Sequence, residues 1–197
     1  MFLSIIIFLC PILLGIQWTL VHASIPSGVT GSEINAGYVS QQKTKWCWAA
    51  SAENACLAEN HHAYNQYYAV QTLKGTIDDP YPNVNGTISD AANAVGVISS
   101  GYLTYTYSMD LAFSILADKI YNTHPVIAGM IPKYSWMGDG HAVLLMGWDT
   151  SSGSDVIKYY DPSPSYTVAI TCDFFDFCTG NNSYLYNYQY CSSAYHN

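Results

Sequence analysis

A cysteine at the start of a helix-forming segment is the first feature of this sequence that could carry out chemistry. Cys47 opens a stretch, residues 47–60, that contains five Ala and no Gly or Pro, and this composition predicts a helix. At the first turn of a helix, unpaired backbone N–H groups and the helix dipole stabilise negative charge. A thiolate, the reactive form of cysteine, is favoured there. We therefore predict that Cys47 is a nucleophile.

A thiolate nucleophile needs a base, and His141 begins an apolar stretch, residues 141–148, that predicts a β-strand. A further predicted strand, 155–160, leads into Asp161, which follows His141 by 20 residues. In two antiparallel strands joined by a loop, the start of the first lies beside the end of the second. His141 and Asp161 are therefore expected to be neighbours, with the carboxylate orienting the imidazole.

An acyl-transfer site also needs hydrogen-bond donors for the oxyanion that develops on the substrate. Gln41 lies six residues before Cys47, on the loop that enters the predicted helix, and its amide could join the Cys47 backbone N–H in this role. Position 42 is also a glutamine, so the oxyanion donor could be either Gln41 or Gln42. Trp136 and Trp46 are candidate substrate-binding residues, and packing in the core is the alternative for both.

The elements that would position these residues change in type along the chain. Helices are predicted first, and a series of strands follows, which indicates an α+β fold with segregated helices and an antiparallel sheet. The predicted helices cover residues 47–60, 61–73, 89–95 and 109–122, the last with Ser108 as N-cap, and the predicted strands cover 38–41, 125–131, 141–148 and 155–160.

The motifs around these residues resemble the motif blocks of papain-like cysteine peptidases, in the family's order of Gln, Cys, His and Asp. The compact branch, with staphopain, avirulence-type effector peptidases and bacteriocin-leader-processing C39-like domains, is the most similar. The resemblance implies a helical half around the cysteine helix, a sheet half with the histidine, and a cleft between them. The matching segments are Gln41, Trp46-Cys47-Trp48-Ala-Ala, Gly140-His141-Ala-Val-Leu-Leu-Met-Gly-Trp148 and Tyr160-Asp161-Pro162.

By this match Cys47 is the nucleophile, His141 the general base and acid, Asp161 its orienter, and Gln41 the oxyanion donor. Papain itself uses Asn where this chain has Asp161, and the Ser-Trp-Gly stretch that follows that residue in papain is absent here. The C-terminal segment 171–197 matches none of the family's motifs.

Composition and charge exclude several other functions. The formal net charge is −8 with only six Lys and Arg, so a nucleic-acid partner is not expected. His61 and His62 are adjacent, and neighbouring residues on a helix point about 100° apart. No Cys-x-x-Cys or His-Glu-x-x-His pattern accompanies them, so we expect no metal site and no cofactor.

The N-terminus predicts export. Residues 1–23 hold a long apolar run followed by Val21-His-Ala23, which is typical of a signal peptide with cleavage before Ser24. A membrane anchor is the alternative, but no membrane association is expected after cleavage. The mature chain, residues 24–197, would form one secreted domain, and the acceptor patterns at Asn85 and Asn181 fit a glycoprotein.

Five cysteines remain after cleavage, an odd number for an oxidising compartment. Cys47 could be half of a disulfide with Cys56, but nine residues along one helix separate them too far for a bond. We expect disulfides within the set Cys56, Cys172, Cys178 and Cys191, with at least one stapling the Tyr-rich C-terminal tail, while the connectivity stays open.

Together these features predict a secreted, monomeric thiol peptidase that acts on protein or peptide substrates through a Cys-His-Asp triad and an acyl-enzyme. Two alternatives remain. A deamidase or transglutaminase-type acyl transferase would use the same triad with a different bond or acceptor. A non-catalytic secreted binding module would use the Tyr-rich tail for recognition.

Overall fold

The computed structural model describes most of the chain that follows the predicted signal peptide. The described residues are 25–109, 111–134, 138–166, 168–181 and 188–197. The predicted signal peptide lies outside these residues. Among the described residues, no helix has both the length and the apolar character that crossing a membrane requires.

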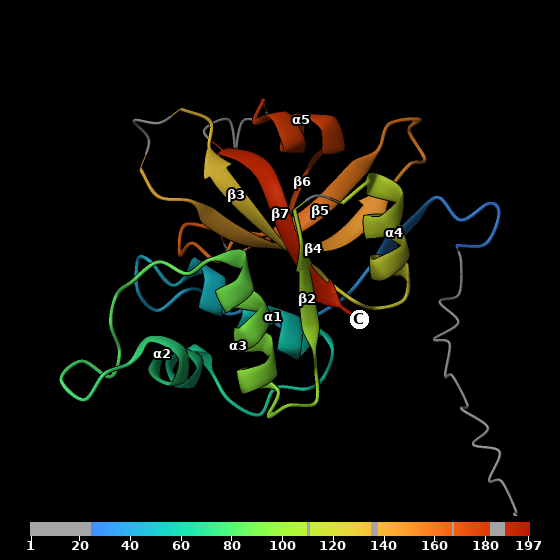
Figure 1. Cartoon of the computed structure of the whole chain (residues 1–197). Coiled ribbons are helices and arrows are strands. Elements are labelled where there is room, and N and C mark those ends of the chain that lie inside the picture. Colours follow the sequence, from blue (N-terminus) through green and yellow to red (C-terminus); the bar gives the residue numbers. More distant parts are fainter. Residues whose placement is uncertain (1–24, 110, 135–137, 167, 182–187) are drawn as a thin grey trace, which may run out of the picture.

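Three helices form the half of the molecule that carries Cys47: α1 (Cys47–Ala58), α2 (Gln66–Lys74) and α3 (Ile88–Ile98). They lie together below the sheet in Figure 1. Helix α1 is buried almost throughout, because its alanines allow neighbouring elements to approach closely. Helix α3 begins with a capping box, in which Thr87 and Asp90 exchange side-chain and backbone hydrogen bonds.

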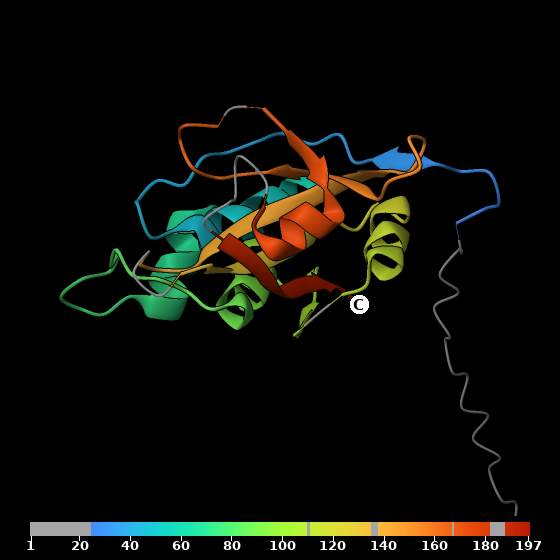
Figure 2. The ribbon, with the colours of Figure 1, turned by 90° about the horizontal axis from the view of Figure 1, so that it is seen from above.

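The other half is a curled antiparallel sheet with strand order β2-β7-β3-β4-β5-β6, and β1 pairs with β4 beside this path. Two further helices, α4 and α5, pack against it. Figure 2 shows the sheet from above, with α4 beside the segment that carries β1. The bounds are β1 (Gly31–Glu33), β2 (Tyr105–Ser108), α4 (Phe113–Tyr121), β3 (Val126–Pro132), β4 (His141–Asp149), β5 (Val156–Tyr160), β6 (Ile170–Asp173), α5 (Phe174–Thr179) and β7 (Tyr188–His196).

Strand β4 separates two hydrophobic cores, and this explains why its sequence is apolar without alternation. Ala142 and Leu144 point into the core that the sheet forms with α1, α2 and α3. Val143 and Leu145 point to the opposite face, into the core that includes α4 and α5. A strand buried on both faces needs apolar residues at every position. The predicted α+β arrangement of a helical half and an antiparallel sheet half is confirmed.

Several predicted boundaries were wrong. Residues 61–65 are not helical, since Asn65 caps α2 by accepting a hydrogen bond from the Tyr68 backbone N–H. The helix predicted to begin after Ser108 starts at Phe113, because Ser108 is the last residue of β2 and pairs with Ser193. Helix α3 continues through Gly96 to Ile98, and the predicted strand 38–41 is absent.

The C-terminal tail contributes most of β6, α5 and the interior strand β7 to the sheet half, rather than forming a disulfide-stapled appendage. Strand β7 pairs with β2 on one side and β3 on the other, and its Ala194 is fully buried opposite Ile127. The described residues contain no disulfide bond, so the predicted disulfide staple is not observed. Backbone pairing on both edges of β7 holds this segment instead.

Candidate active site

Cys47 is the first residue of α1, at the boundary between the two halves of the molecule. Trp46 precedes it as N-cap and makes no side-chain capping hydrogen bond. The backbone N–H groups of the first turn therefore remain available to stabilise negative charge near the thiol. Further along the helix, the buried Ser51 hydroxyl donates to the Ala142 carbonyl at 3.1 Å, which fixes α1 against the start of β4.

His141 is the first residue of β4, and Asp161 directly follows β5, so the antiparallel pairing of the two strands brings them together. The His141 Nε2 lies 2.9 Å from the Asp161 Oδ1, and the side chains are 14% and 6% exposed. The same Oδ1 accepts from the Ser163 N–H at 2.8 Å, and the Tyr38 hydroxyl donates to the Asp161 carbonyl. These contacts hold the carboxylate in place.

The electrostatic setting of His141 favours its charged form. Burial lowers the pKa of His141, but hydrogen bonds with Asp161 and Cys47, together with their negative charges, raise it from 6.5 to about 10. Because Nε2 faces Asp161, the other ring nitrogen, Nδ1, is the one left for the sulfur of Cys47. The imidazole thus hydrogen-bonds to the carboxylate and lines a cavity with the thiol, and the role of the three groups as a catalytic triad stays a prediction.

Two cavities meet at this pair. One, of about 190 Å³, is lined by Cys47 and His141 together with mostly apolar residues of α1, α3, β3 and β7. The other is also lined by Cys47 and His141 and is more polar, with Gln41, Asp139 and Tyr188 in its walls. Cys47 and His141 therefore border a surface depression formed by the two cavities, in which a substrate chain could lie.

The structure places the remaining predicted residues differently. Gln41 borders the polar cavity, but its amide nitrogen donates to the Lys43 and Thr44 carbonyls at 3.1 and 3.0 Å. Its role as oxyanion donor stays a prediction. Gln42 is exposed and its amide donates to the Ser40 carbonyl, so it is the weaker candidate of the two.

The tryptophans also differ from expectation. Trp46 is fully buried, with its indole N–H donating to the Pro82 carbonyl at 2.9 Å. It packs edge-on against Tyr67 and has no surface to offer a substrate, so the substrate-binding assignment of Trp46 was wrong and the core alternative holds. Trp136 lies outside the described residues.

Some residues of the site could not be found from the sequence. Asn85 lines both cavities. A hydrogen bond with the Asn85 side chain, together with the charge of Lys45 at 3.5 Å, lowers the pKa of the Asp139 carboxyl. The ring of Tyr188 lies 5.7 Å from that of His141. These residues come from loops and from β7, and no local pattern marks them. Asn85 and Asn181, the two predicted glycosylation acceptors, are both exposed, and Asn85 borders the two cavities.

The cysteines divide by environment. Cys56 is buried in α1, burial raises the pKa of its thiol, and the thiol donates to the Val95 carbonyl at 3.5 Å. Cys191 lines the apolar cavity, with its sulfur 3.1 Å from the Gly129 carbonyl. Cys47 lines two cavities together with the His141 imidazole, and its role as nucleophile stays a prediction.

No family model matches the sequence, and no curated protein matches it either. Solved structures do match. A putative C39-like peptidase from Bacillus anthracis aligns with a TM-score of 0.57 at 10% identity, covering 85% of this chain and 98% of that one. Digestive procathepsin L 3 from the larval midgut of Tenebrio molitor aligns with a TM-score of 0.52 at 13% identity, covering 89% and 72%.

The fold is papain-like. At these identities the likeness concerns the fold alone, and it confirms the architecture that the motif resemblance implied. The papain-like chain thus has its helical half, its sheet half and, at their junction, the depression that holds Cys47 and His141.

Proposed function

We propose that this chain is a thiol-dependent peptidase with Cys47 as nucleophile, His141 as acid and base, and Asp161 as orienter. The observation that carries the proposal is the grouping of three side chains on one surface depression: the His141 imidazole is hydrogen-bonded to Asp161 at 2.9 Å, and it lines the same cavity as Cys47 at the start of α1. The papain-like fold supports it, because both neighbours are named as peptidases or their precursors.

In the proposed reaction, the Cys47 thiolate attacks a peptide carbonyl carbon and forms a C–S bond. The developing oxyanion accepts a hydrogen bond from the Cys47 backbone N–H, and the His141 imidazolium gives its proton to the leaving amine as the C–N bond breaks. Neutral His141 then takes a proton from water, whose oxygen attacks the thioester. Breakdown of that intermediate releases the carboxylic acid and restores the thiolate–imidazolium pair.

The apolar cavity indicates what the substrate presents beside the scissile bond. Its volume, about 190 Å³, is somewhat larger than a 150 Å³ cavity that binds benzene. Trp48, Ile88, Met130 and Ala142 form much of its wall. We therefore propose that a substrate residue with one medium-sized apolar side chain binds here, while the polar cavity accepts the chain on the other side of Cys47.

Cleavage of a peptide library, followed by mass spectrometry, tests the proposal. Wild type should cut peptides with an apolar residue near the cleaved bond, and Cys47→Ala should be inactive while folding normally. Adding a primary amine tests the alternative of acyl transfer, because a transferase would produce amide products in place of free acids. Cleavage that persists in Cys47→Ala would refute the thiol mechanism, and binding without cleavage in wild type would favour a non-catalytic module.

We also propose that the mature protein is exported as a monomer after removal of residues 1–23. The apolar N-terminal run and the residues before Ser24 support this proposal. N-terminal sequencing of protein collected outside expressing cells should begin at Ser24. Retention of the intact N-terminus in a membrane fraction would instead show an anchor.

A further inference from the structure

Away from the proposed active site, three side chains from distant parts of the chain converge on one point. Glu59 Oε2 lies 3.0 Å from His196 Nδ1 and 3.4 Å from His124 Nδ1, and the two imidazole nitrogens are 3.0 Å apart. Among the described residues, this is the group of His, Cys, Asp and Glu whose ligand atoms come close enough to hold a metal ion.

The three residues are held there by the fold. Glu59 is the C-cap residue of α1, His124 lies in the turn between α4 and β3, and His196 is the last residue of β7. The Glu59 side chain is only 6% exposed, and the two imidazoles are about one quarter exposed. The imidazole rings stand nearly perpendicular, at 86°, so that their Nδ1 atoms approach each other without stacking.

A second set of contacts orients these groups. The Tyr105 hydroxyl donates to Glu59 Oε1 at 2.7 Å, which leaves Oε2 directed at the two histidines. Lys119 donates to the His196 carbonyl at 2.9 Å and fixes the backbone that carries this imidazole. Partners that orient a ligating carboxylate or imidazole from behind are a general feature of metal sites.

A cation accounts for this convergence better than hydrogen bonds do. A carboxylate oxygen only accepts and each Nδ1 carries at most one proton, so at least one of the three contacts must bring together two lone pairs or two N–H groups. A tetrahedral Zn²⁺ ion with bonds of 2.0–2.1 Å separates its ligand atoms by about 3.3 Å. The three distances in the structure, 3.0, 3.0 and 3.4 Å, are close to one face of such a tetrahedron.

We propose that Glu59, His124 and His196 bind a Zn²⁺ ion. Two imidazoles and one carboxylate are the donor set that zinc accepts and that Ca²⁺ and Mg²⁺, with their preference for oxygen, do not. The C-terminal end of α1 adds the negative end of a helix dipole, which further favours a cation. The fourth coordination position faces a surface cavity whose wall includes His61 and Tyr102, so water can complete the site.

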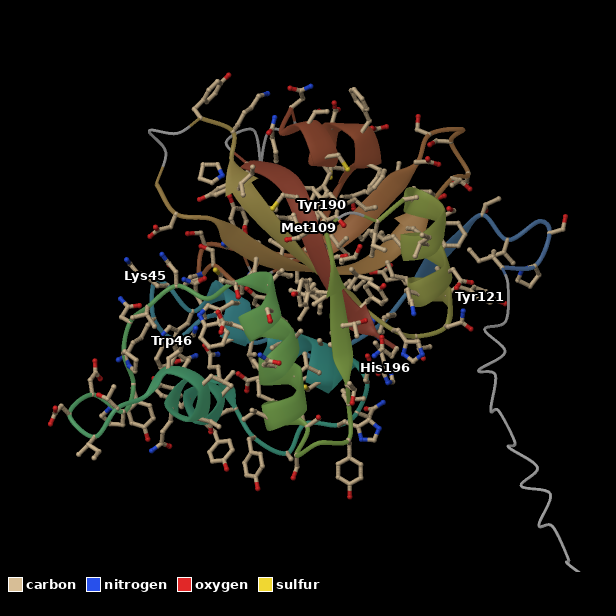
Figure 3. All side chains as sticks on the ribbon, viewed as in Figure 1. Lys45, Trp46, Met109, Tyr121, Tyr190 and His196 are labelled. Carbon is tan, nitrogen blue, oxygen red and sulfur yellow. The ribbon has the colours of Figure 1, made fainter. Side chains whose placement is uncertain are left out.

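The position of the site indicates a structural role. Glu59 follows Cys47 by 12 residues, which along α1 corresponds to about 18 Å, too far for the ion to act on the thiol. In Figure 3, Trp46, which precedes Cys47, and His196 lie at opposite ends of this helix. The ion would instead join β7, the central strand from the C-terminal tail, to the helix that carries the nucleophile.

The test measures zinc binding in a Cys47→Ser background, which removes the competing thiolate of the proposed active site. Competition with a chromophoric chelator should show one tight site per chain, and Co²⁺ should give the intense visible absorption of a tetrahedral centre. Calcium and magnesium should not compete. Zinc at about 100 times Kd should raise the Tm by roughly 5–10 °C.

Variants then assign the site. His196→Gln and His124→Gln should each weaken zinc binding by at least about 100-fold and abolish the Tm shift, and Tyr105→Phe should weaken it by about 10–100-fold. The control is His62→Gln, because His62 also pairs with a buried glutamate, Glu53, at 2.9 Å, but without a third ligand. It should leave zinc affinity unchanged.

Two results would overturn the proposal. The first is the absence of a tight zinc site in the Cys47→Ser protein, judged by the chelator and by the Co²⁺ spectrum. The second is zinc affinity that stays unchanged in both His124→Gln and His196→Gln. The Co²⁺ spectrum is recorded on the Cys47→Ser protein with all three ligands present. It therefore tests whether the metal site exists even if one of the ligand variants fails to fold.

Discussion

Replacing Asp161 by Asn separates the charge of the orienting residue from its hydrogen bond. The amide keeps an oxygen that can accept from His141 Nε2, now 2.9 Å from the carboxylate, and from the Ser163 N–H at 2.8 Å. What the variant loses is the negative charge. Asp161→Asn should therefore leave the geometry of the site intact while weakening the preference of His141 for its protonated form.

The size of the effect follows from the distance. With charge centres about 4 Å apart and an effective dielectric constant of about 20, the attraction is worth about 4 kcal/mol. At about 1.4 kcal/mol per pH unit, losing it lowers the pKa of His141 from about 10 toward about 7. The imidazolium is fully present below its pKa and is lost as the pH rises through it. In wild type it should therefore persist to about pH 9, whereas in the variant it should be lost between about pH 6 and 8.

The pH titration of the His141 imidazole by NMR measures this directly, and the alkaline limb of kcat/KM should move in parallel. Asp161→Ala, which also removes the acceptor, should reduce kcat/KM by a further factor of about 100. Asp149→Asn is the control, because Asp149 accepts from the Ser151 N–H far from the thiol and should change neither measurement. An unchanged pKa of His141 in Asp161→Asn would refute the electrostatic reasoning.

Three other substitutions test separate parts of the structure. Gln41→Ala should lower kcat by about 10²-fold if its amide turns to the oxyanion during the reaction, whereas Gln42→Ala should leave kcat unchanged; equal effects would remove Gln41 from the mechanism. In Gly86→Ala the new methyl group would come within 2.4 Å of the buried Trp48 indole, so urea denaturation should show a loss of about 1–3 kcal/mol, and unchanged stability would contradict this packing. Ala194→Asp would bury an unpaired charge in β7 and should lower the free energy of unfolding by about 3–5 kcal/mol in the same assay. Unchanged stability would contradict the placement of β7 between β2 and β3.

The placement of Cys47 at a helix start and of His141 beside Asp161 was predictable because local signals determine it. The alanine-rich stretch after Cys47 favours a helix whatever packs against it, and the two apolar strands around the turn at 150–154 pair as neighbours in the chain. Once that hairpin is recognised, the adjacency of His141 and Asp161 follows from antiparallel geometry. The papain-like motif order then connects the hairpin to the helix.

The C-terminal tail could not be predicted because its structure depends on distant residues. Strand β7 has no β-branched residue, and its place between β2 and β3 rests on pairing with segments more than 50 residues away. Pairing with Ser193 of the same strand also places Ser108 in β2, where the sequence predicted a helix N-cap. It also brings His196 to Glu59, so a candidate zinc site arises without any spacing motif in the sequence.

Selective alkylation tests most directly whether His141 activates the Cys47 thiol beside it. At pH 6 an ordinary thiol is only about 0.3% ionised and reacts slowly. With a limiting amount of a thiol-directed epoxide at this pH, mass spectrometry should find the label on Cys47, with Cys56 and Cys191 unmodified. In His141→Ala the selective labelling should disappear. Labelling of Cys47 that is no faster than that of Cys191, or that survives the loss of His141, would contradict the proposed mechanism.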